Sequence, residues 1–550
     1  MEKTEKQKRI KKEGFMQSVL VLMISQLVIK LLGLVYKIYL TNKEGFGDTG
    51  NAIYSSGYQI YALLLTISSI GVPNAISKLV SEKVAIGDSK GAHRIFKIAL
   101  LTFGIIGFIA TMVLFVGAGY ISSAILQIPE AEMTLVALSP AIFFVTIASV
   151  LRGYFNGREK ISVTAKSQTL EQIFKTLLTV IVVEIVGLTT NLNTTLMSAG
   201  ANLATTLSVL LSFGYLTMYY KLYKRNIAIE IKNSVNHKHE SLKKVVKKIL
   251  FVSTPITLSA IMSTLNKNID SITVVRGLKK FLTEAQAKSQ YGILSGKVDT
   301  LITLPLSFNI AFATALVPSI ASSIARRDKE SASKRISFSI LVSILIGLPC
   351  TVGMMMFSQP ILELLFPKAT NGSILLQLSA ITIIFSVLAQ TINGALQGLG
   401  KIMTPAITST IGLIIKLIIN VLLIQIPEIG VYGAAIGSII NNIVAFILSF
   451  VVLVRTIKLD MRFIKCVIKP LIATIIMGIC SYYIYLLIQG IISTRIATII
   501  AIIVAIIIYT LSLLVLKILD KEEIKMIPYG TKLLKILETV GIYGKGKHCK

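Results

Sequence analysis

The stretch FMQSVLVLMISQLVIKLLGLVYKIYL, residues 15–40, decides the fold, because it contains 26 residues and only two charges. A helix of about 20 apolar residues crosses a bilayer, so this run is long enough to span one. The charges are Lys30 and Lys37, and steps of four, three and four residues join Gln26, Lys30, Gly33 and Lys37. On a helix these four residues form one polar stripe. Because a lysine inside a membrane costs about 2.5–3.5 kcal/mol, the stripe is a candidate functional site.

The composition of the whole chain agrees with this first run. Of the 550 residues, 54% are hydrophobic and 15% are charged, and the mean hydropathy is +0.77. These values are far from those of a soluble domain. We therefore predict an all-α polytopic membrane protein with about fourteen transmembrane helices. The predicted spans are residues 15–40, 53–76, 98–119, 133–151, 168–188, 197–219, 249–269, 293–318, 336–356, 374–396, 404–426, 433–454, 466–488 and 491–516.

Basic residues set the predicted orientation, because cytoplasmic connections retain lysine and arginine. Residues 1–13 hold six of them, and the alternate connections are basic as well. Those groups are Lys78 with Lys83, Arg158 with Lys160, Lys243 with Lys244, Arg326 with Arg327, Lys401, and Arg455 with Arg462. Both termini are therefore predicted to lie in the cytoplasm, in a protein of the plasma membrane. The connection after the seventh span departs from the pattern, with Arg276, Lys279, Lys280 and Lys288.

The net charge of +30 is best explained by contact with anionic membrane lipids, and no nucleic-acid partner is predicted. The first apolar run is longer than the core of a signal peptide, so we expect it to remain as a span. The cysteines and histidines lack the spacing of metal ligands and form no catalytic cluster. We therefore predict no metal, no cofactor and no enzymatic activity. These residues are Cys350, Cys466, Cys480, Cys549, His93, His237, His239 and His548.

An internal repeat emerges when the chain is aligned with itself at a shift of 245 residues. The matches are collinear and fall at equivalent places in the predicted spans, which favours a duplication over chance similarity between apolar segments. They predict two parallel six-helix repeats with a central cleft between them. The prolines and glycines among them are expected to shape helix ends and close contacts. The pairs are Pro73 with Pro318, Gly153 with Gly398 and, after a four-residue deletion, Lys175 with Lys416.

The repeat and the charge pattern together divide the chain into predicted segments. The first is a basic N-terminus, the last is an amphipathic cytoplasmic tail, and a basic linker joins the two lobes. Two further helices follow the second lobe. In order, the segments are residues 1–13, the N-lobe 14–220, the linker 221–248, the C-lobe 249–454, the extra helices 455–516 and the tail 517–550.

Three segments resemble a known family: GVPNAISKLVSEK (71–83), LRGYFNGREKISVTAKSQTLEQIFK (151–175) and YGILSGKVDTLITLPLSFNIAFATALVPSIASS (291–323). They are similar to the polysaccharide biosynthesis and stage V sporulation protein B group. That group belongs to the multidrug, oligosaccharidyl-lipid and polysaccharide exporter superfamily, which includes the lipid II flippases. The resemblance implies a V-shaped pair of lobes, a membrane groove made by the last two spans, and alternating access. It also implies an undecaprenyl-linked glycolipid as cargo and the cell-wall synthesis machinery as a partner.

The first-span lysines suit such a cargo, because a polyprenyl diphosphate carries a doubly anionic linker across about 30 Å of hydrocarbon. Lysine offers a point charge that suits phosphate. Lys30 and Lys37 lie about 10.5 Å apart along the helix axis. The lipid II flippases place basic residues of the first span in their cavity, and this resemblance assigns the same role to Lys30 first and Lys37 second, beside Gln26. Alternatively, Lys37 could extend to the outer headgroups.

Other intramembrane charges leave alternatives open. Glu171 and Lys175 are four residues apart and could neutralise one another on a helix, which would leave Lys175 a packing role. Lys416 has Gly412 at the position equivalent to Glu171, so it lacks that local partner and is the better cavity candidate.

A second group of charges lies at the start of the second lobe. Lys267 and Asp270 could pair with each other, or Asp270 could bind a coupling Na⁺ or proton. Lys297 and Asp299 could line the outer half of the cleft or mark its interface. The sequence does not choose between these alternatives.

The sequence thus predicts a flippase of lipid-linked oligosaccharides, with the peptidoglycan precursor lipid II as the favoured cargo. A teichoic-acid, capsule or spore-specific precursor remains an alternative. A drug or cation antiporter of the same superfamily is a rival, although a basic first span suits anions. A major-facilitator transporter is disfavoured, because residues 77–97 lack its glycine, aspartate and arginine signature. The membrane potential could help an outward-moving diphosphate, by about 2.3 kcal/mol per charge and 100 mV.

Overall fold

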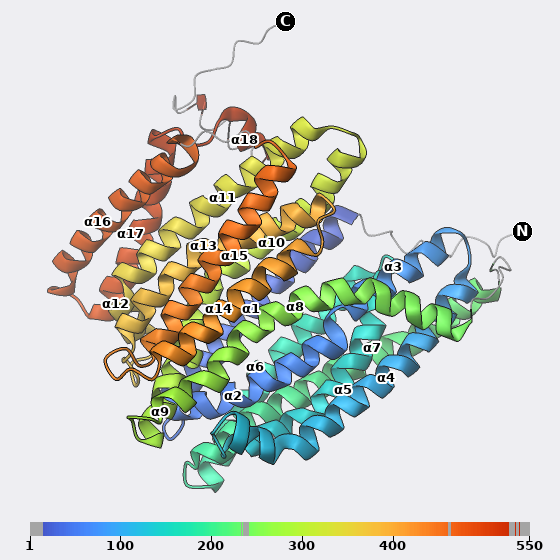
Figure 1. Cartoon of the computed structure of the whole chain (residues 1–550), viewed down its shortest axis with the longest axis horizontal. Coiled ribbons are helices and arrows are strands. Elements are labelled where there is room, and N and C mark those ends of the chain that lie inside the picture. The colour runs from blue at the N-terminus through green and yellow to red at the C-terminus, as the bar shows by residue number, and fades with distance from the viewer. Residues whose placement is uncertain are drawn as a thin grey trace, which may run out of the picture. The chain divides into compact units, whose positions relative to one another are not determined.

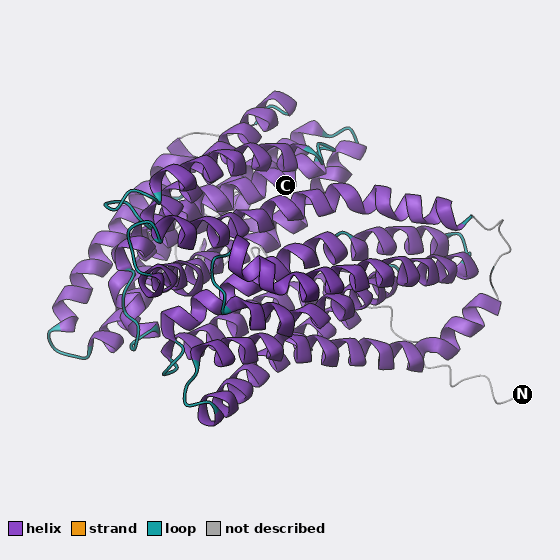
Figure 2. Ribbon diagram, turned by 60° about the horizontal axis from the view of Figure 1, so that its bottom comes forward, coloured by secondary structure: helices purple, strands orange, loops and turns teal. Residues whose placement is uncertain are grey.

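The computed structural model of the chain describes residues 15–232, 234, 241–459, 464–526, 534 and 538–539. Within these ranges the chain forms helices joined by short loops, and no residue there is in a strand (Figure 2). The predicted all-α fold is therefore confirmed. The predicted basic N-terminus, residues 1–13, lies outside the described residues.

The helices follow the predicted spans closely along the chain (Figure 1). In chain order they are α1 (Phe15–Asn42), α2 (Gly47–Leu65), α3 (Val72–Ala85), α4 (Ser89–Tyr120), α5 (Ala131–Asn156), α6 (Ile161–Thr189), α7 (Thr194–Lys232), α8 (Leu242–Leu278), α9 (Glu284–Gly292), α10 (Asp299–Ala325), α11 (Lys329–Met356), α12 (Ser358–Leu365), α13 (Ser373–Gly398), α14 (Thr404–Leu423), α15 (Tyr432–Thr456), α16 (Lys469–Gln489), α17 (Thr494–Val515) and α18 (Lys521–Met526). Four π-helical turns interrupt them, η1 (Thr66–Ile70), η2 (Ile121–Ile125), η3 (Ile293–Val298) and η4 (Ile464–Ile468).

Eleven helices within the described ranges are long and apolar enough to cross a membrane, and the bent helix α8 makes up to twelve. The predicted count of fourteen is therefore not confirmed. Two predicted spans, which correspond to α1 and α10, are not among these twelve helices. Some side chains of both helices are not described by the structure.

The chain divides into two compact units that are each described separately. The first unit takes its described residues from 1–40 and 53–268, and the second from 41–52 and 269–550. Most of the first six predicted spans therefore belong to the first unit. The short segment 41–52, between α1 and the body of α2, belongs to the second unit.

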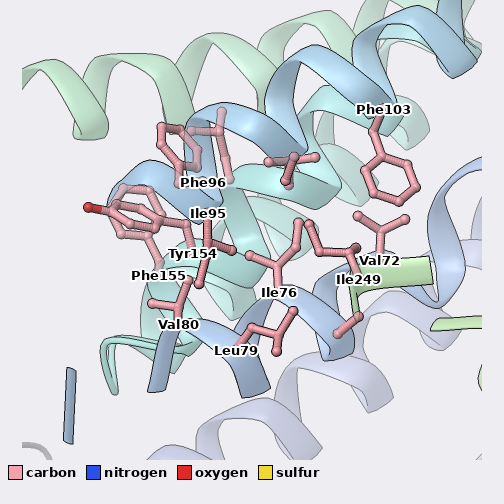
Figure 3. Close-up of a cluster of buried hydrophobic side chains, with 14 of the residues drawn as sticks. Val72, Ile76, Leu79, Val80, Ile95, Phe96, Phe103, Tyr154, Phe155 and Ile249 are labelled. Carbon is pink, nitrogen blue, oxygen red and sulfur yellow. The ribbon is translucent and has the colours of Figure 1, made fainter. Parts of the chain in front are cut away.

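A core of buried side chains holds the first unit together (Figure 3). Helix α3 contributes a face of apolar residues at helical spacing, and α4, α5 and α8 contribute the side chains that cover it. The rings of Phe96 and Tyr154 stack at 4.4 Å between centroids. Other members of this core are Val72, Ile76, Leu79, Val80, Ile95, Phe103, Phe155 and Ile249.

Equivalent glycines make equivalent close contacts in the two units. In the first unit, a Cβ added to Gly153 of α5 would lie 2.9 Å from the Cα of Pro73 of α3. In the second unit, a Cβ added to Gly398 of α13 would lie 2.9 Å from the Cβ of Ile320 of α10. The side chain of Pro318 lies outside the described part. Both glycines therefore allow two helices to approach closely, as small residues do in membrane bundles.

Proline explains the π-turn η1 in the second predicted span. Pro73 occupies the first turn of α3 and cannot donate a backbone hydrogen bond, so the helix restarts there. The hydroxyls of Thr66 and Ser69 donate to the carbonyl oxygens of Ala62 and Leu65, at 2.7 Å each. These bonds satisfy part of the interrupted helix internally, which a membrane setting requires.

The second unit is built around α10, α11, α13 and α15. Its core includes Ile320, Ile336, Ile392 and Leu396. The two extra helices, α16 and α17, pack against one another and against α11. The hydroxyl of Tyr509 on α17 donates to the carbonyl oxygen of Leu345 on α11 at 2.9 Å.

The basic connection after α8 contains an acidic partner for two of its lysines. The Glu284 carboxylate pairs with Lys288 at 2.7 Å and with Lys279 at 3.1 Å, and Thr283 caps α9. Hydrogen bonds from Lys288 and Lys279 hold the pKa of Glu284 below its usual range. This pairing offsets part of the charge by which the connection departs from the alternating pattern. Of the predicted amphipathic tail, the structure describes Lys521–Met526 as α18 and few residues beyond it.

Candidate functional site

Lys37 lies near the end of α1, where its side chain is 8% exposed. Its ammonium group lies 4.3 Å from the centre of the Tyr54 ring and 3.4 Å from the Ser55 hydroxyl, both on α2. A cation over an aromatic face is stabilised by about 0.5–2 kcal/mol, more when it is desolvated. The lysine is therefore held inside the first unit.

Lys175 of α6 lies in the same part of the first unit as Lys37, and the residue is 6% exposed. Its ammonium group lies 4.4 Å from the ring centre of Tyr58 and 5.2 Å from that of Tyr36. The hydroxyls of Tyr36 and Tyr54 are 3.5 Å apart, and the rings of Tyr54 and Tyr58 stack at 5.9 Å. We call these five residues the lysine–tyrosine cluster: Lys37, Lys175, Tyr36, Tyr54 and Tyr58.

The expected pairing of Glu171 with Lys175 is wrong. The Glu171 carboxylate instead accepts a hydrogen bond from the Arg152 guanidinium of α5 at 2.7 Å. Among the described residues, no carboxylate forms an ion pair with Lys175. Arg152 was not part of the predicted site, and it binds the Glu171 carboxylate through Nη2 alone, while its Nε donates to the Ser167 hydroxyl.

Lys30, about two turns before Lys37 on α1, differs from it in exposure. Its side chain is exposed in the first unit, and no hydrogen bond or ion pair joins it to the described residues. Lys267 of α8 lies near enough for the two positive charges to act on each other. Two like charges at one surface attract an anion. The side chain of Gln26, the remaining polar residue of the predicted stripe, lies outside the described part.

A buried ion pair occupies the second unit. The ammonium group of Lys416 on α14 lies 2.6 Å from the Asp270 carboxylate on α8, and Lys416 is fully buried. Asn420, one turn along α14, donates to the other Asp270 oxygen at 2.9 Å. Lys416 thus has a long-range partner where the sequence showed no local one. A coupling cation at Asp270 would compete with this ammonium group.

Lys297, in the π-turn η3, is also fully buried and paired. Its ammonium group lies 3.0 Å from the Asp48 carboxylate and donates to the carbonyl oxygen of Ala369 at 2.9 Å. Asp48 belongs to the segment 41–52 of the second unit. The ammonium group of Lys297 is therefore engaged in a structural contact. Asp299, two residues later, lies within electrostatic reach of Asp270.

Two glycines bring the segment 41–52 into this contact. A Cβ on Gly292 would lie 1.8 Å from the Asp48 carbonyl oxygen, and a Cβ on Gly296 would lie 2.6 Å from the side chain of Asn51. The two glycines are four residues apart, the spacing of close helix approach in membranes. Asn42, at the other end of the segment, donates to the Leu365 carbonyl oxygen at 2.8 Å.

The pair of Lys297 and Asp48 provides a first test. Lys297→Met is expected to lower the free energy of unfolding by about 3–5 kcal/mol, because it leaves a carboxylate without its cation. Thermal unfolding of the purified protein measures the loss, and the exchanged pair Asp48→Lys with Lys297→Asp should recover part of it. Lys334→Met, which breaks an exposed pair with Glu330, is the matched control and should leave the unfolding temperature unchanged. Equal effects of both lysine variants would contradict the structural role.

The tyrosines and Asp48 were missed by sequence reasoning. A signal for the tyrosines existed, since Tyr54 and Tyr58 lie four residues apart on one helix face and belong to the span next to the lysines. Asp48 lies in the first turn of its helix, where acidic residues are common. Its position therefore did not indicate Lys297 as its partner. No group of three or more potential metal ligands occurs within the described ranges.

Residues 15–323, more than half of the chain, match the family described as polysaccharide biosynthesis protein. The chain belongs to this family. A further match, to the MatE family, covers residues 295–422 of this polysaccharide biosynthesis protein family member.

Several known proteins are similar to this family member. Stage V sporulation protein B of Bacillus subtilis (strain 168) is 25% identical, over 95% of this chain and 99% of its own length. Lipid II flippase MurJ of the same organism is 26% identical, over 74% of this chain and 77% of its own length. A solved structure of lipid II flippase MurJ in an inward closed conformation aligns with a TM-score of 0.65 at 16% identity, over 90% of this chain and 98% of that one.

An inward-facing multidrug resistance MATE family transporter of the MOP superfamily aligns with a TM-score of 0.62 at 15% identity. That alignment covers 79% of this chain and 98% of the transporter. The solved structures show that the fold is shared. The MurJ relative is named a flippase and the MATE neighbour is named a transporter. This family member shares their fold and is a multi-pass membrane protein.

Proposed function

We propose that this transporter moves an undecaprenyl-diphosphate-linked sugar from the inner to the outer leaflet of the plasma membrane, with lipid II as the favoured cargo. The observation that carries the proposal is the setting of Lys175. Its ammonium group is buried among tyrosine rings, while the nearby Glu171 carboxylate binds Arg152.

A buried ammonium group is costly unless a negative charge accompanies it. Tyrosine rings lower that cost through their negative faces, yet they are neutral and leave the positive charge in place. Lys175 is therefore held in a form that attracts an anion. Together with Lys37 and the exposed Lys30, it gives the first unit three lysines on α1 and α6, which suits the two negative charges of a diphosphate.

The names of the relatives support this class of cargo, since one of them is a lipid II flippase. The lysines recognise the diphosphate and not the sugar, so teichoic-acid, capsule and spore-wall precursors share the same chemistry. Mass spectrometry of lipids that purify with the protein would distinguish these cargoes. We further propose that both termini are cytoplasmic, as the basic connections predict, and that a cell-wall synthesis enzyme receives the cargo. The membrane potential is the proposed driving force, and an imposed potassium diffusion potential tests it.

Lys175→Met tests the proposed function directly. Methionine matches the length of the lysine stem and carries no charge, so we expect unfolding temperature to stay the same or to rise. Translocation of a lipid-linked diphosphate sugar in liposomes should fall by about 10-fold to 100-fold, since a hydrogen bond to a charged group contributes about 1.5–3 kcal/mol.

Two outcomes separate this proposal from its rivals. Lys175→Arg keeps the charge and should retain most of the translocation. Full translocation by Lys175→Met would remove the proposed role of the cluster. Drug-dependent exchange of protons or sodium ions in the same liposomes, without movement of the glycolipid, would identify a cation antiporter instead.

A further inference from the structure

A second arginine, Arg158, lies in the tight turn between α5 and α6, away from the lysine–tyrosine cluster. Its side chain is only 4% exposed. Its guanidinium group lies over the ring of Tyr154 at 4.7 Å, and its Nη1 donates to the Glu230 carboxylate near the end of α7. The turn is fixed by Gly157, where a Cβ would lie 2.7 Å from the Ser77 carbonyl oxygen. Arg158 is thus held by the Tyr154 ring and the Glu230 carboxylate.

One edge of this guanidinium group finds no acceptor among the residues that the structure describes. Nε and Nη2 of Arg158 are buried, and no hydrogen bond to either is found among the described residues. These two nitrogens form the side of the fork that binds two oxygens of one phosphate or carboxylate. Leaving such donors unsatisfied is costly, and native proteins rarely do so without a reason.

Arg152, six residues earlier, provides a comparison within the same unit. Its Nε donates to the Ser167 hydroxyl at 3.0 Å, and its Nη2 donates to Glu171 at 2.7 Å and to Ser212 at 3.0 Å. The equivalent nitrogens of Arg152 are therefore satisfied within the protein. The open edge of Arg158 is a property of its own site.

The surroundings of Arg158 favour an anion. Lys97 and Lys224 act electrostatically on the same neighbourhood as Arg158, around His93. Lys160 lies 3.6 Å from the ring centre of Tyr223. Glu230 offsets part of this positive charge, but its side chain is 39% exposed and can move towards solvent.

Near this site, helix α7 carries the residue types that are typical of the level of lipid headgroups. Tyr215, Tyr219 and Tyr223 recur every fourth residue on one face, and their rings contact each other in sequence. Tyrosines of this kind are typical of the boundary between membrane and water. On the adjacent surface, Met218 and Leu222 are 64% and 71% exposed, as suits contact with acyl chains. By the predicted orientation this end of the unit faces the cytoplasm.

We propose that Arg158 binds the phosphate group of an anionic phospholipid headgroup through its Nε and Nη2 edge. Glu230 acts as a built-in competitor, because its carboxylate holds the other side of the guanidinium group and repels the phosphate. Movement of Glu230 into solvent removes this repulsion and leaves the positive charge of the guanidinium group to the phosphate. This lipid site is distinct from the proposed cargo site and does not depend on it.

Thermal unfolding of the full-length protein in detergent tests the site with three probes: dioctanoyl phosphatidylglycerol, dioctanoyl phosphatidylcholine and inorganic phosphate at matched ionic strength. We expect phosphatidylglycerol to raise the unfolding temperature of the wild type and phosphatidylcholine not to. Glu230→Gln should bind phosphatidylglycerol about 10-fold more tightly, and Arg158→Gln should lose the shift. Arg225→Gln removes an exposed charge from the same end of α7 and should behave as wild type.

A fourth variant covers the case in which the arginine substitution prevents folding. If Arg158→Gln fails to fold, Arg158→Lys retains the charge without the fork and should bind less tightly than wild type. A stabilisation by inorganic phosphate equal to that by phosphatidylglycerol would support phosphate recognition but assign it to a soluble phosphate. Equal shifts in the wild type, Glu230→Gln and the arginine variant would overturn the proposal, and so would weaker binding by Glu230→Gln.

Discussion

Replacing Lys30 with alanine is expected to reduce translocation of a lipid-linked diphosphate sugar to background, while the protein inserts and folds as the wild type does. Lys30 is exposed and makes no ion pair with the described residues, so its removal costs the fold little. The lost interaction is a charged hydrogen bond to phosphate, about 1.5–3 kcal/mol, which corresponds to about 10-fold to 100-fold in rate. Loss of attraction for the second phosphate oxygen adds to this effect. A liposome assay with the purified variant measures it.

Two further variants control for charge and position. Lys30→Arg keeps the positive charge and should retain translocation, although a planar fork replaces a point charge. Lys166→Ala removes an exposed lysine from α6, outside the proposed site, and should leave translocation unchanged. Normal headgroup translocation by Lys30→Ala would contradict the phosphate role, and so would an equal loss in Lys166→Ala.

The helices of this protein could be predicted from the sequence because a single physical requirement determines them. A backbone in hydrocarbon must satisfy its own hydrogen bonds, so every long apolar run is a helix. The predicted spans and the observed helices agree in type and in order along the chain for this reason, although the count of fourteen spans is not confirmed. The π-turn η1 was not predicted, although Pro73 marks the place where the helical hydrogen bonds are interrupted.

The charged pairs of the second unit could not be predicted, because their members are far apart in sequence. Lys297 is 249 residues from Asp48, and Lys416 is 146 residues from Asp270. Spacing on one helix shows only partners three or four residues away. That spacing rule predicted Glu171 as the partner of Lys175. The prediction is wrong because the Glu171 carboxylate binds Arg152, which is 19 residues away in the sequence.

The pair of Lys416 and Asp270 also shows why burial alone does not identify a cargo site. Lys416 and Lys175 are repeat equivalents and are both buried, but Lys416 has a carboxylate at 2.6 Å whereas Lys175 is surrounded by tyrosine rings. The Asp270 carboxylate therefore neutralises Lys416. Among the described residues, no carboxylate neutralises Lys175 in the same way. The proposed difference in function between the two lysines therefore rests on their partners, a carboxylate for Lys416 and tyrosine rings for Lys175.

Replacing Lys416 with methionine is therefore expected to destabilise the protein strongly, by about 3–5 kcal/mol, because a buried carboxylate loses its cation. The double variant Lys416→Met with Asp270→Asn removes both charges and should recover most of that loss, and a double-mutant cycle measured by thermal unfolding gives the coupling between them. Rescue of Lys416→Met by sodium ions, absent in the double variant, would show that Asp270 can hold a coupling cation once the ammonium group has left. Additive effects of the two substitutions would instead show that the pair contributes nothing beyond its separate members.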